Sequence, residues 1–140
     1  KNESLLFVTL ACFILNLKTG LLTYSNAGHN RPVLLRRDGT TEWMELPKGI
    51  VLGVMPEAAF TTRSFQLRPG DKIIMETDGV TEATGPEEED FGPERTAASL
   101  GRGRPKPLGE SIGDLLDEVK AWAGGEAFAD DVSVLGIEVA

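Results

Sequence analysis

The sequence has little cysteine and histidine, and it has no apolar run long enough to cross a membrane. Cys12 and His29 are the only residues of their types in the 140-residue chain. A single cysteine excludes an internal disulfide, and its apolar neighbours predict a small buried side chain in a reducing, cytoplasmic compartment. The nearly continuous apolar segment at residues 5–15 is shorter than the roughly 20 residues of a transmembrane helix. We therefore expect no membrane insertion by this segment.

Basic residues are also outnumbered by acidic ones. The chain has 14 lysines and arginines against 22 aspartates and glutamates, a net charge of -8 and a pI of about 4.7. Such a surface disfavours nucleic acid and anionic membranes as partners. The hydrophobic content of 41% supplies enough apolar material for a core, which argues against disorder. The length of 140 residues corresponds to one domain at most.

Strand signals dominate the first half of the chain. Residues 7–15 are rich in β-branched and aromatic types and apolar on both faces, which predicts a strand buried on both sides. A turn at residues 16–20 and alternation over residues 21–26 complete a predicted β-hairpin. Further strands are predicted at residues 33–36, 60–67, 72–77 and 131–139.

Helix signals come later. A short helix is predicted at residues 93–100, and the clearest helix spans residues 108–122 because its apolar residues fall on one face at helical spacing. Gly124 and Gly125 end it. The polar segment 101–107 and the acidic run 87–90 read as exposed. Strands, then helices, then one strand predict an α+β fold with a sheet-and-helix sandwich.

Four ordered segments carry a family resemblance. They are residues 7–10 leading through the hairpin to NAGHNRP at 26–32, LGV at 52–54, LRPGD at 67–71 followed by a strand and TDGVTEA at 77–83, and DDVSV at 130–134. Phe91 and Gly92 stand where this branch usually has that pair. The ordered set covers nearly the whole chain and resembles the SpoIIE/RsbU-type branch of the PPM (type 2C) Ser/Thr protein phosphatases.

The resemblance implies a β-sandwich flanked by helices, with a binuclear Mn²⁺ or Mg²⁺ site at one edge. It also implies hydrolysis of phosphoserine or phosphothreonine in a regulatory protein, of the anti-anti-sigma kind, within a bacterial sigma-factor or stress pathway. Hard divalent cations prefer carboxylate and water oxygens. Two of them about 3.5–4 Å apart activate a water and hold the phosphoryl oxygens for in-line attack.

The match to the family motifs assigns residue roles. Asp78 and Asp130 would be metal ligands, and Gly79 would let the backbone pass close to the site. Glu82 and Asp131 would support the ligands from outside the coordination shell. Each has a plainer alternative outside the motif context: a turn at Asp78–Gly79, and a solvated strand start at Asp130–Asp131.

His29 and Glu76 need separate treatment. As the only histidine, His29 is a possible general base, but it follows a strand in a Gly-His-Asn turn, where such residues adopt special backbone conformations. We therefore expect it to support the backbone, and we assign no catalytic side chain. Glu76 departs from the family pattern, in which an aromatic or small residue precedes Thr-Asp-Gly.

The match is incomplete at the N-terminal side. The family's domain begins with a Gly-Asp-rich metal motif and two helices, and this chain starts about where the second of those helices would end. The chain also does not begin with Met. We expect residues 1–140 to be the C-terminal portion of a single PPM-type domain that lacks the Asp bridging both metals. Weak Mn²⁺ or Mg²⁺ binding, little activity and self-association through an uncovered apolar sheet face are the expected consequences.

Two alternatives stay open. One is a catalytically silent regulatory or binding module of the same fold, although a decayed site would more often have lost Asp78 or Asp130. The other is an unrelated β-rich domain, which would leave the ordered motifs to coincidence.

Overall fold

The structure is a computed structural model that describes residues 6–125 and 127–140. Seven strands and three helices occur among these residues. The chain forms two compact units, Lys1–Arg31 with Glu45–Arg68 and Pro32–Met44 with Pro69–Ala140. No helix in the described part of the chain is both long and apolar enough to span a membrane.

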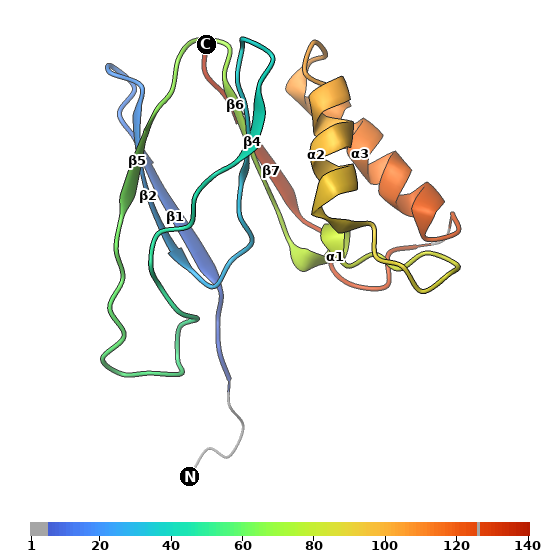
Figure 1. Cartoon of the computed structure of the whole chain (residues 1–140), viewed down its shortest axis with the longest axis horizontal. Helices are drawn as coiled ribbons and strands as arrows, with labels where there is room; N and C mark the ends of the chain where they lie inside the picture. The colour runs from blue at the N-terminus through green and yellow to red at the C-terminus, as the bar shows by residue number, and fades with distance from the viewer. Residues whose placement is uncertain (1–5, 126) are drawn as a thin grey trace. The chain divides into compact units, whose positions relative to one another are not determined.

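The first unit contains a three-stranded antiparallel sheet in the order β1-β2-β5 (Figure 1). Its strands are β1 (Leu10–Leu15), β2 (Leu21–Ala27) and β5 (Arg63–Gln66). The predicted hairpin is confirmed, because β1 and β2 pair antiparallel from Leu10 with Ala27 to Leu15 with Leu22. Tyr24 is fully buried and stacks on Phe13 with ring centroids 4.6 Å apart.

Two predictions for β1 are wrong. The strand is not buried on both sides, since Ile14 keeps 68% of its surface exposed and Leu10 keeps 49%. Cys12 is exposed rather than buried. The reason is strand alternation, which puts Leu10, Cys12 and Ile14 together on the face of β1 that is exposed, opposite to the face of Phe13.

The second unit is a four-stranded antiparallel sheet in the order β4-β3-β6-β7, with helices against it (Figure 1). Its elements are β3 (Val33–Leu35), β4 (Thr41–Trp43), β6 (Lys72–Glu76), β7 (Val134–Glu138), α2 (Gly92–Arg102) and α3 (Leu108–Trp122). The bounds of α3 match the prediction. Its buried stripe packs with the sheet in one core, made of Val33, Leu35, Ile74, Val80, Phe91, Leu100, Leu115 and Val119.

Several predicted bounds need adjustment. The strand expected at 60–67 covers only Arg63–Gln66, the one at 131–139 begins at Val134, and the helix expected at 93–100 extends over Gly92–Arg102. A short helix that the sequence did not predict, α1 (Asp78–Thr81), follows β6 directly. Four residues are too few to show helical periodicity, which explains the omission.

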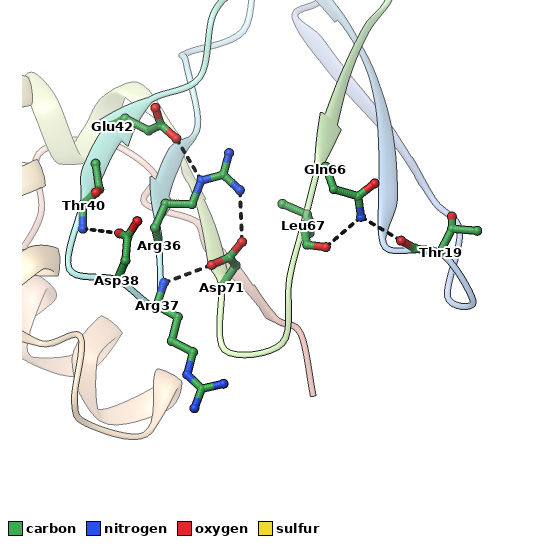
Figure 2. Close-up of polar contacts among 9 residues, drawn as sticks. All are labelled: Thr19, Arg36, Arg37, Asp38, Thr40, Glu42, Gln66, Leu67 and Asp71. Atoms are coloured by element: carbon green, nitrogen blue, oxygen red, sulfur yellow. Dashed lines mark hydrogen bonds and ion pairs between the residues drawn. The ribbon is translucent and has the colours of Figure 1, made fainter.

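Asp71, the last residue of the LRPGD segment, connects three strands of the second unit, and Figure 2 shows its carboxylate bound to Arg36 and to the Arg37 backbone. Its side chain is 3% exposed, and one carboxylate oxygen lies 3.0 Å from Nη1 of Arg36. The other oxygen accepts the Arg37 backbone N–H at 2.9 Å, and the Asp71 carbonyl accepts the Val139 N–H at 2.9 Å. The sequence indicated only a turn here, whereas the structure shows a buried carboxylate joining the end of β3 to the β6 and β7 pair.

Candidate metal centre

The pairing of β6 with β7 brings the two predicted metal ligands to one end of the sheet. The strands are antiparallel, and Glu76 at the end of β6 lies opposite Val134 at the start of β7. The Thr77 N–H donates to the Ser133 carbonyl at 3.0 Å, which extends the ladder by one step. Asp78, the first residue of α1, therefore emerges beside the segment that carries Asp130.

The side chain of Thr77 fixes this arrangement. Its hydroxyl accepts the Ser133 backbone N–H at 2.9 Å and donates to the Asp131 carbonyl at 3.2 Å. Thr77 is the N-cap residue of α1, but its side chain makes no capping bond to that helix. The hydroxyl instead holds the loop of Asp130 and Asp131 against the start of α1.

Gly79 allows the two segments to approach. A Cβ at this position would lie 2.6 Å from the Asp131 carbonyl oxygen and 2.9 Å from Cγ2 of Val132. Real Cβ atoms do not come that close, so any side chain at Gly79 would push the Asp131 loop away from α1. The close approach is thus a structural reason for glycine here.

The donor chemistry suits a hard divalent cation, although the number of donors is small. Asp78, Asp130 and Asp131 are all exposed, and one Asp130 carboxylate oxygen accepts the Asp131 N–H at 2.8 Å. Carboxylate oxygens are what Mg²⁺ and Mn²⁺ prefer. Within residues 6–125 and 127–140, however, no three His, Cys, Asp or Glu side chains are grouped so as to hold a metal. The described residues fit part of a metal site, to which Asp78 and Asp130 would contribute.

Glu82 follows α1 and takes part in it through its backbone. Its N–H donates to the Asp78 carbonyl at 2.8 Å, and its own carbonyl accepts the Thr84 hydroxyl at 3.2 Å. The Glu82 side chain is exposed. Its contacts therefore support α1.

His29 belongs to the first unit, where its backbone closes a turn. Its N–H donates to the Asn26 side-chain oxygen at 2.8 Å, and the Asn26 amide donates back to the His29 carbonyl at 3.0 Å. Gly28 has φ of 72°, which the turn requires and which glycine adopts at little cost. Asn26 is buried and also donates to the Tyr24 hydroxyl at 2.6 Å. The NAGHN segment is thereby explained as a side-chain-closed turn.

Glu76, which departs from the family pattern, lies buried at the end of β6. It is 2% exposed, and neither carboxylate oxygen has a hydrogen-bond partner within the described part of the chain. Burial is the main reason that the pKa of Glu76 rises to about 7, and the charge of nearby Asp78 acts in the same direction. The signal in the sequence was one acidic residue at the end of the otherwise largely apolar strand 72–76.

Comparison with known proteins decides the family. The whole chain, residues 1–140, matches the family model described as Stage II sporulation protein E (SpoIIE). This chain belongs to the SpoIIE family. Membership confirms the predicted PPM resemblance and rules out the unrelated β-rich domain.

Individual relatives agree with the SpoIIE assignment. Protein IcfG of Synechocystis sp. is 36% identical over 136 residues, which are 97% of this chain and 21% of IcfG. The RsbU and RsbW domains of Rv1364c from Mycobacterium tuberculosis match with a TM-score of 0.80 and 26% identity, over 93% of this chain and 35% of that one. The phosphatase domain of SpoIIE from Bacillus subtilis matches with a TM-score of 0.72 and 21% identity, over 94% and 58%. These structures confirm the predicted α+β PPM fold, and this SpoIIE-family chain spans only part of each relative's length.

Proposed function

We propose that this chain supplies Asp78 and Asp130 as ligands of a binuclear Mn²⁺ or Mg²⁺ centre in a Ser/Thr protein phosphatase. The observation that carries the proposal is the pair of hydrogen bonds that the Thr77 hydroxyl makes to Ser133 and Asp131. In a chain of the SpoIIE family, these bonds hold the TDG and DD segments side by side. Solved relatives support the choice of metal, since one is RsbX in complex with magnesium and another is a SpoIIE phosphatase domain presoaked with Mn.

The chain's own residues would divide the work at this centre. Asp78 and Asp130 would hold the cations, Thr77 would keep their two segments together, and Gly79 would leave space for the Asp131 backbone. Bound ions of this type lower the pKa of a coordinated water and neutralise developing charge on a phosphoryl group. Glu82 and Asp131 would support the ligands through their backbone contacts.

The remaining ligands must come from elsewhere, because two carboxylates do not make a binuclear site. The chain spans 58% of the Bacillus subtilis SpoIIE phosphatase-domain chain. We infer that residues 1–140 are the C-terminal portion of one phosphatase domain, in which a preceding segment brings the bridging carboxylate. The 140-residue chain alone would then bind Mn²⁺ weakly and have little phosphatase activity.

The proposed substrate is a phosphorylated regulatory protein of the anti-anti-sigma type, in a cytoplasmic sigma-factor or stress-signalling pathway. RsbU and SpoIIE relatives support this choice. The net charge of -8 argues against nucleic acid as a partner. Self-association is proposed through the exposed face of β1, where Leu10 and Ile14 leave apolar surface in solvent. A monomeric sedimentation profile at high concentration would contradict it.

A second candidate is a catalytically silent regulatory module of the same fold. The small number of grouped metal donors in the described residues favours this alternative. The presence of both Asp78 and Asp130 favours the phosphatase.

A phosphatase assay on the full-length parent protein separates the two candidates. With Mn²⁺ and a phosphoserine protein substrate, Asp78→Asn and Asp130→Asn should each lower kcat by at least about a hundredfold, because each removes a ligand charge. Asp114→Asn is the matched control, because Asp114 lies on the surface of α3 and forms an ion pair with Lys106, which precedes that helix. Phosphatase activity that survives both ligand substitutions would reject the proposed centre, and an inactive parent protein would favour the regulatory module.

A further inference from the structure

The segment that follows α1 is a short acidic hairpin, residues 84–90. Thr84 and Asp90 form an antiparallel bridge, and the Gly85 N–H donates to the Glu89 carbonyl at 2.9 Å. Four consecutive acidic residues, 87–90, form its tip and return arm. Glu88 at the tip has φ of 58°, a conformation unusual outside glycine. The surrounding contacts must therefore hold this hairpin in place.

Arg95 on α2 makes several of those contacts. One guanidinium nitrogen lies 2.9 Å from the Glu89 carboxylate, and the other donates to the Asp90 and Phe91 carbonyls at 3.3 and 3.1 Å. The guanidinium carbon lies 4.0 Å from the centroid of the Trp122 ring. A planar fork that stacks and donates at once is particular to arginine.

Trp122 at the end of α3 holds the same hairpin from its own side. Its indole N–H donates to the Glu89 carbonyl at 3.0 Å. A Cβ at Gly85 would lie 2.9 Å from the indole nitrogen, so the hairpin backbone packs directly against the ring. The Phe91 ring meets Trp122 edge-on at 6.2 Å.

The hairpin is connected to the proposed metal ligand through two backbone bonds. The Phe91 N–H donates to the Ala83 carbonyl at 2.8 Å, and the Glu82 N–H donates to the Asp78 carbonyl at 2.8 Å. The second of these bonds spans α1, whose four residues cannot form a stable helix without packing. Its N-cap residue, Thr77, gives it no side-chain bond.

We propose that Arg95 and Trp122 are positioning residues for Asp78. By clamping the acidic hairpin to α2 and α3, they fix the C-terminal end of α1 and with it the direction of the Asp78 carboxylate. The inference rests on the proposed metal centre. The competing explanation is that Val80, which is fully buried in the core, holds α1 by itself.

Arg102 offers a matched control on the same helix. It also pairs with one exposed glutamate, since its guanidinium lies 2.9 and 2.7 Å from the two Glu118 carboxylate oxygens. Among the described residues, its hydrogen bonds and ion pairs do not reach the hairpin. Arg95→Met and Arg102→Met thus each remove one exposed ion pair, and only the first releases the clamp.

The first measurement is amide hydrogen exchange in this chain without metal. Arg95→Met should speed exchange at Glu82 and Phe91 by about tenfold, because local opening becomes easier. Arg102→Met should leave both amides unchanged. Trp122→Phe should fall between wild type and Arg95→Met, since it keeps an aromatic ring but loses the donor to Glu89. Unchanged exchange in Arg95→Met and Trp122→Phe would overturn the inference in favour of Val80.

The second measurement is the apparent Mn²⁺ affinity of the parent protein by calorimetry. Arg95→Met should weaken it by about tenfold, as expected for a residue that orients a ligand. Arg95→Lys should recover part of the loss, because an ammonium keeps the Glu89 pair but cannot reach both carbonyls. Equal affinities for wild type and Arg95→Met would overturn the positioning role. A wild-type protein that binds no Mn²⁺ would instead overturn the proposed function.

Discussion

Thr77 and Ser133 are joined by two hydrogen bonds that run in opposite directions. The Thr77 N–H donates to the Ser133 carbonyl at 3.0 Å, and the Ser133 N–H donates to the Thr77 hydroxyl at 2.9 Å. The first bond is a continuation of the β6 and β7 ladder, whereas the second requires a hydroxyl side chain. This pair sets where Asp78 leaves the sheet relative to the loop of Asp130.

Replacing Thr77 tests that relationship. Thr77→Val keeps the shape but removes a hydroxyl that makes two hydrogen bonds, so the free energy of unfolding should fall by about 1–2 kcal/mol. Thr77→Ser retains the hydroxyl and should lose less than half as much. Urea denaturation of the three proteins gives the comparison. A larger loss for serine than for valine would show that the methyl group, and not the hydroxyl, provides the stabilisation.

Gly79 should tolerate no side chain. Gly79→Ala places a Cβ 2.6 Å from the Asp131 carbonyl oxygen, and overlap of this kind costs about 1–3 kcal/mol. Gly113→Ala is the control, because nothing lies within 4 Å of its Cβ position in α3 and alanine favours a helix interior by about 1 kcal/mol. Thermal unfolding should therefore move in opposite directions for the two variants. A neutral Gly79→Ala variant would mean that the Asp131 loop moves aside without cost.

Replacing Asp71 should lower the free energy of unfolding far more than replacing an exposed acidic residue nearby. Asp71→Ala leaves Arg36 without its buried partner and also removes the acceptor of the Arg37 N–H, for an expected loss of about 3 kcal/mol. Glu42→Ala removes the more exposed partner of the same arginine and should cost less than about 1 kcal/mol. Figure 2 shows both carboxylates around Arg36. If Asp71→Ala and Glu42→Ala lose similar free energies of unfolding in denaturant, burial does not make the Asp71 pair stronger than the Glu42 pair.

Glu76 should make stability depend on pH. Its pKa in the folded chain is raised to about 7 from an ordinary 4.5, so the folded state holds a proton that the unfolded state has released. The stabilisation is complete below about pH 4.5 and is lost as the pH rises through 7, by about 2–3 kcal/mol between pH 5 and 8. Glu76→Gln should remove this contribution. Parallel pH profiles for the two proteins in denaturant unfolding would show that Glu76 is not the responsible group.

The sequence predicted the elements whose patterns are long or locally specified. The helix over residues 108–122 was found from its apolar stripe, of which Leu115 and Val119 are fully buried. The first hairpin was predicted from alternation and a turn, and β1 and β2 do pair antiparallel. The exposure of Cys12 could not be predicted, because it depends on which face of β1 is covered, and the apolar residues on both faces of this strand do not show that.

The proposed metal ligands could be predicted from sequence motifs, but the residues that hold them in place could not. Asp78 and Asp130 were selected because their segments match a family pattern. The contact of Thr77 with Ser133 joins residues 56 positions apart, and the contact of Arg95 with Trp122 joins residues 27 positions apart. No local periodicity encodes such pairs, and only the packed second unit brings them together.

The most direct test of the account is a calorimetric Mn²⁺ titration of two proteins, this chain and a version extended toward the N-terminus by the preceding part of the phosphatase domain. We predict weak or undetectable binding by the 140 residues alone. The longer protein should bind Mn²⁺ clearly, and Asp78→Asn or Asp130→Asn should abolish that binding. If the longer protein binds Mn²⁺ equally well with both aspartates replaced, or does not bind it at all, the chain does not contribute ligands to a metal centre.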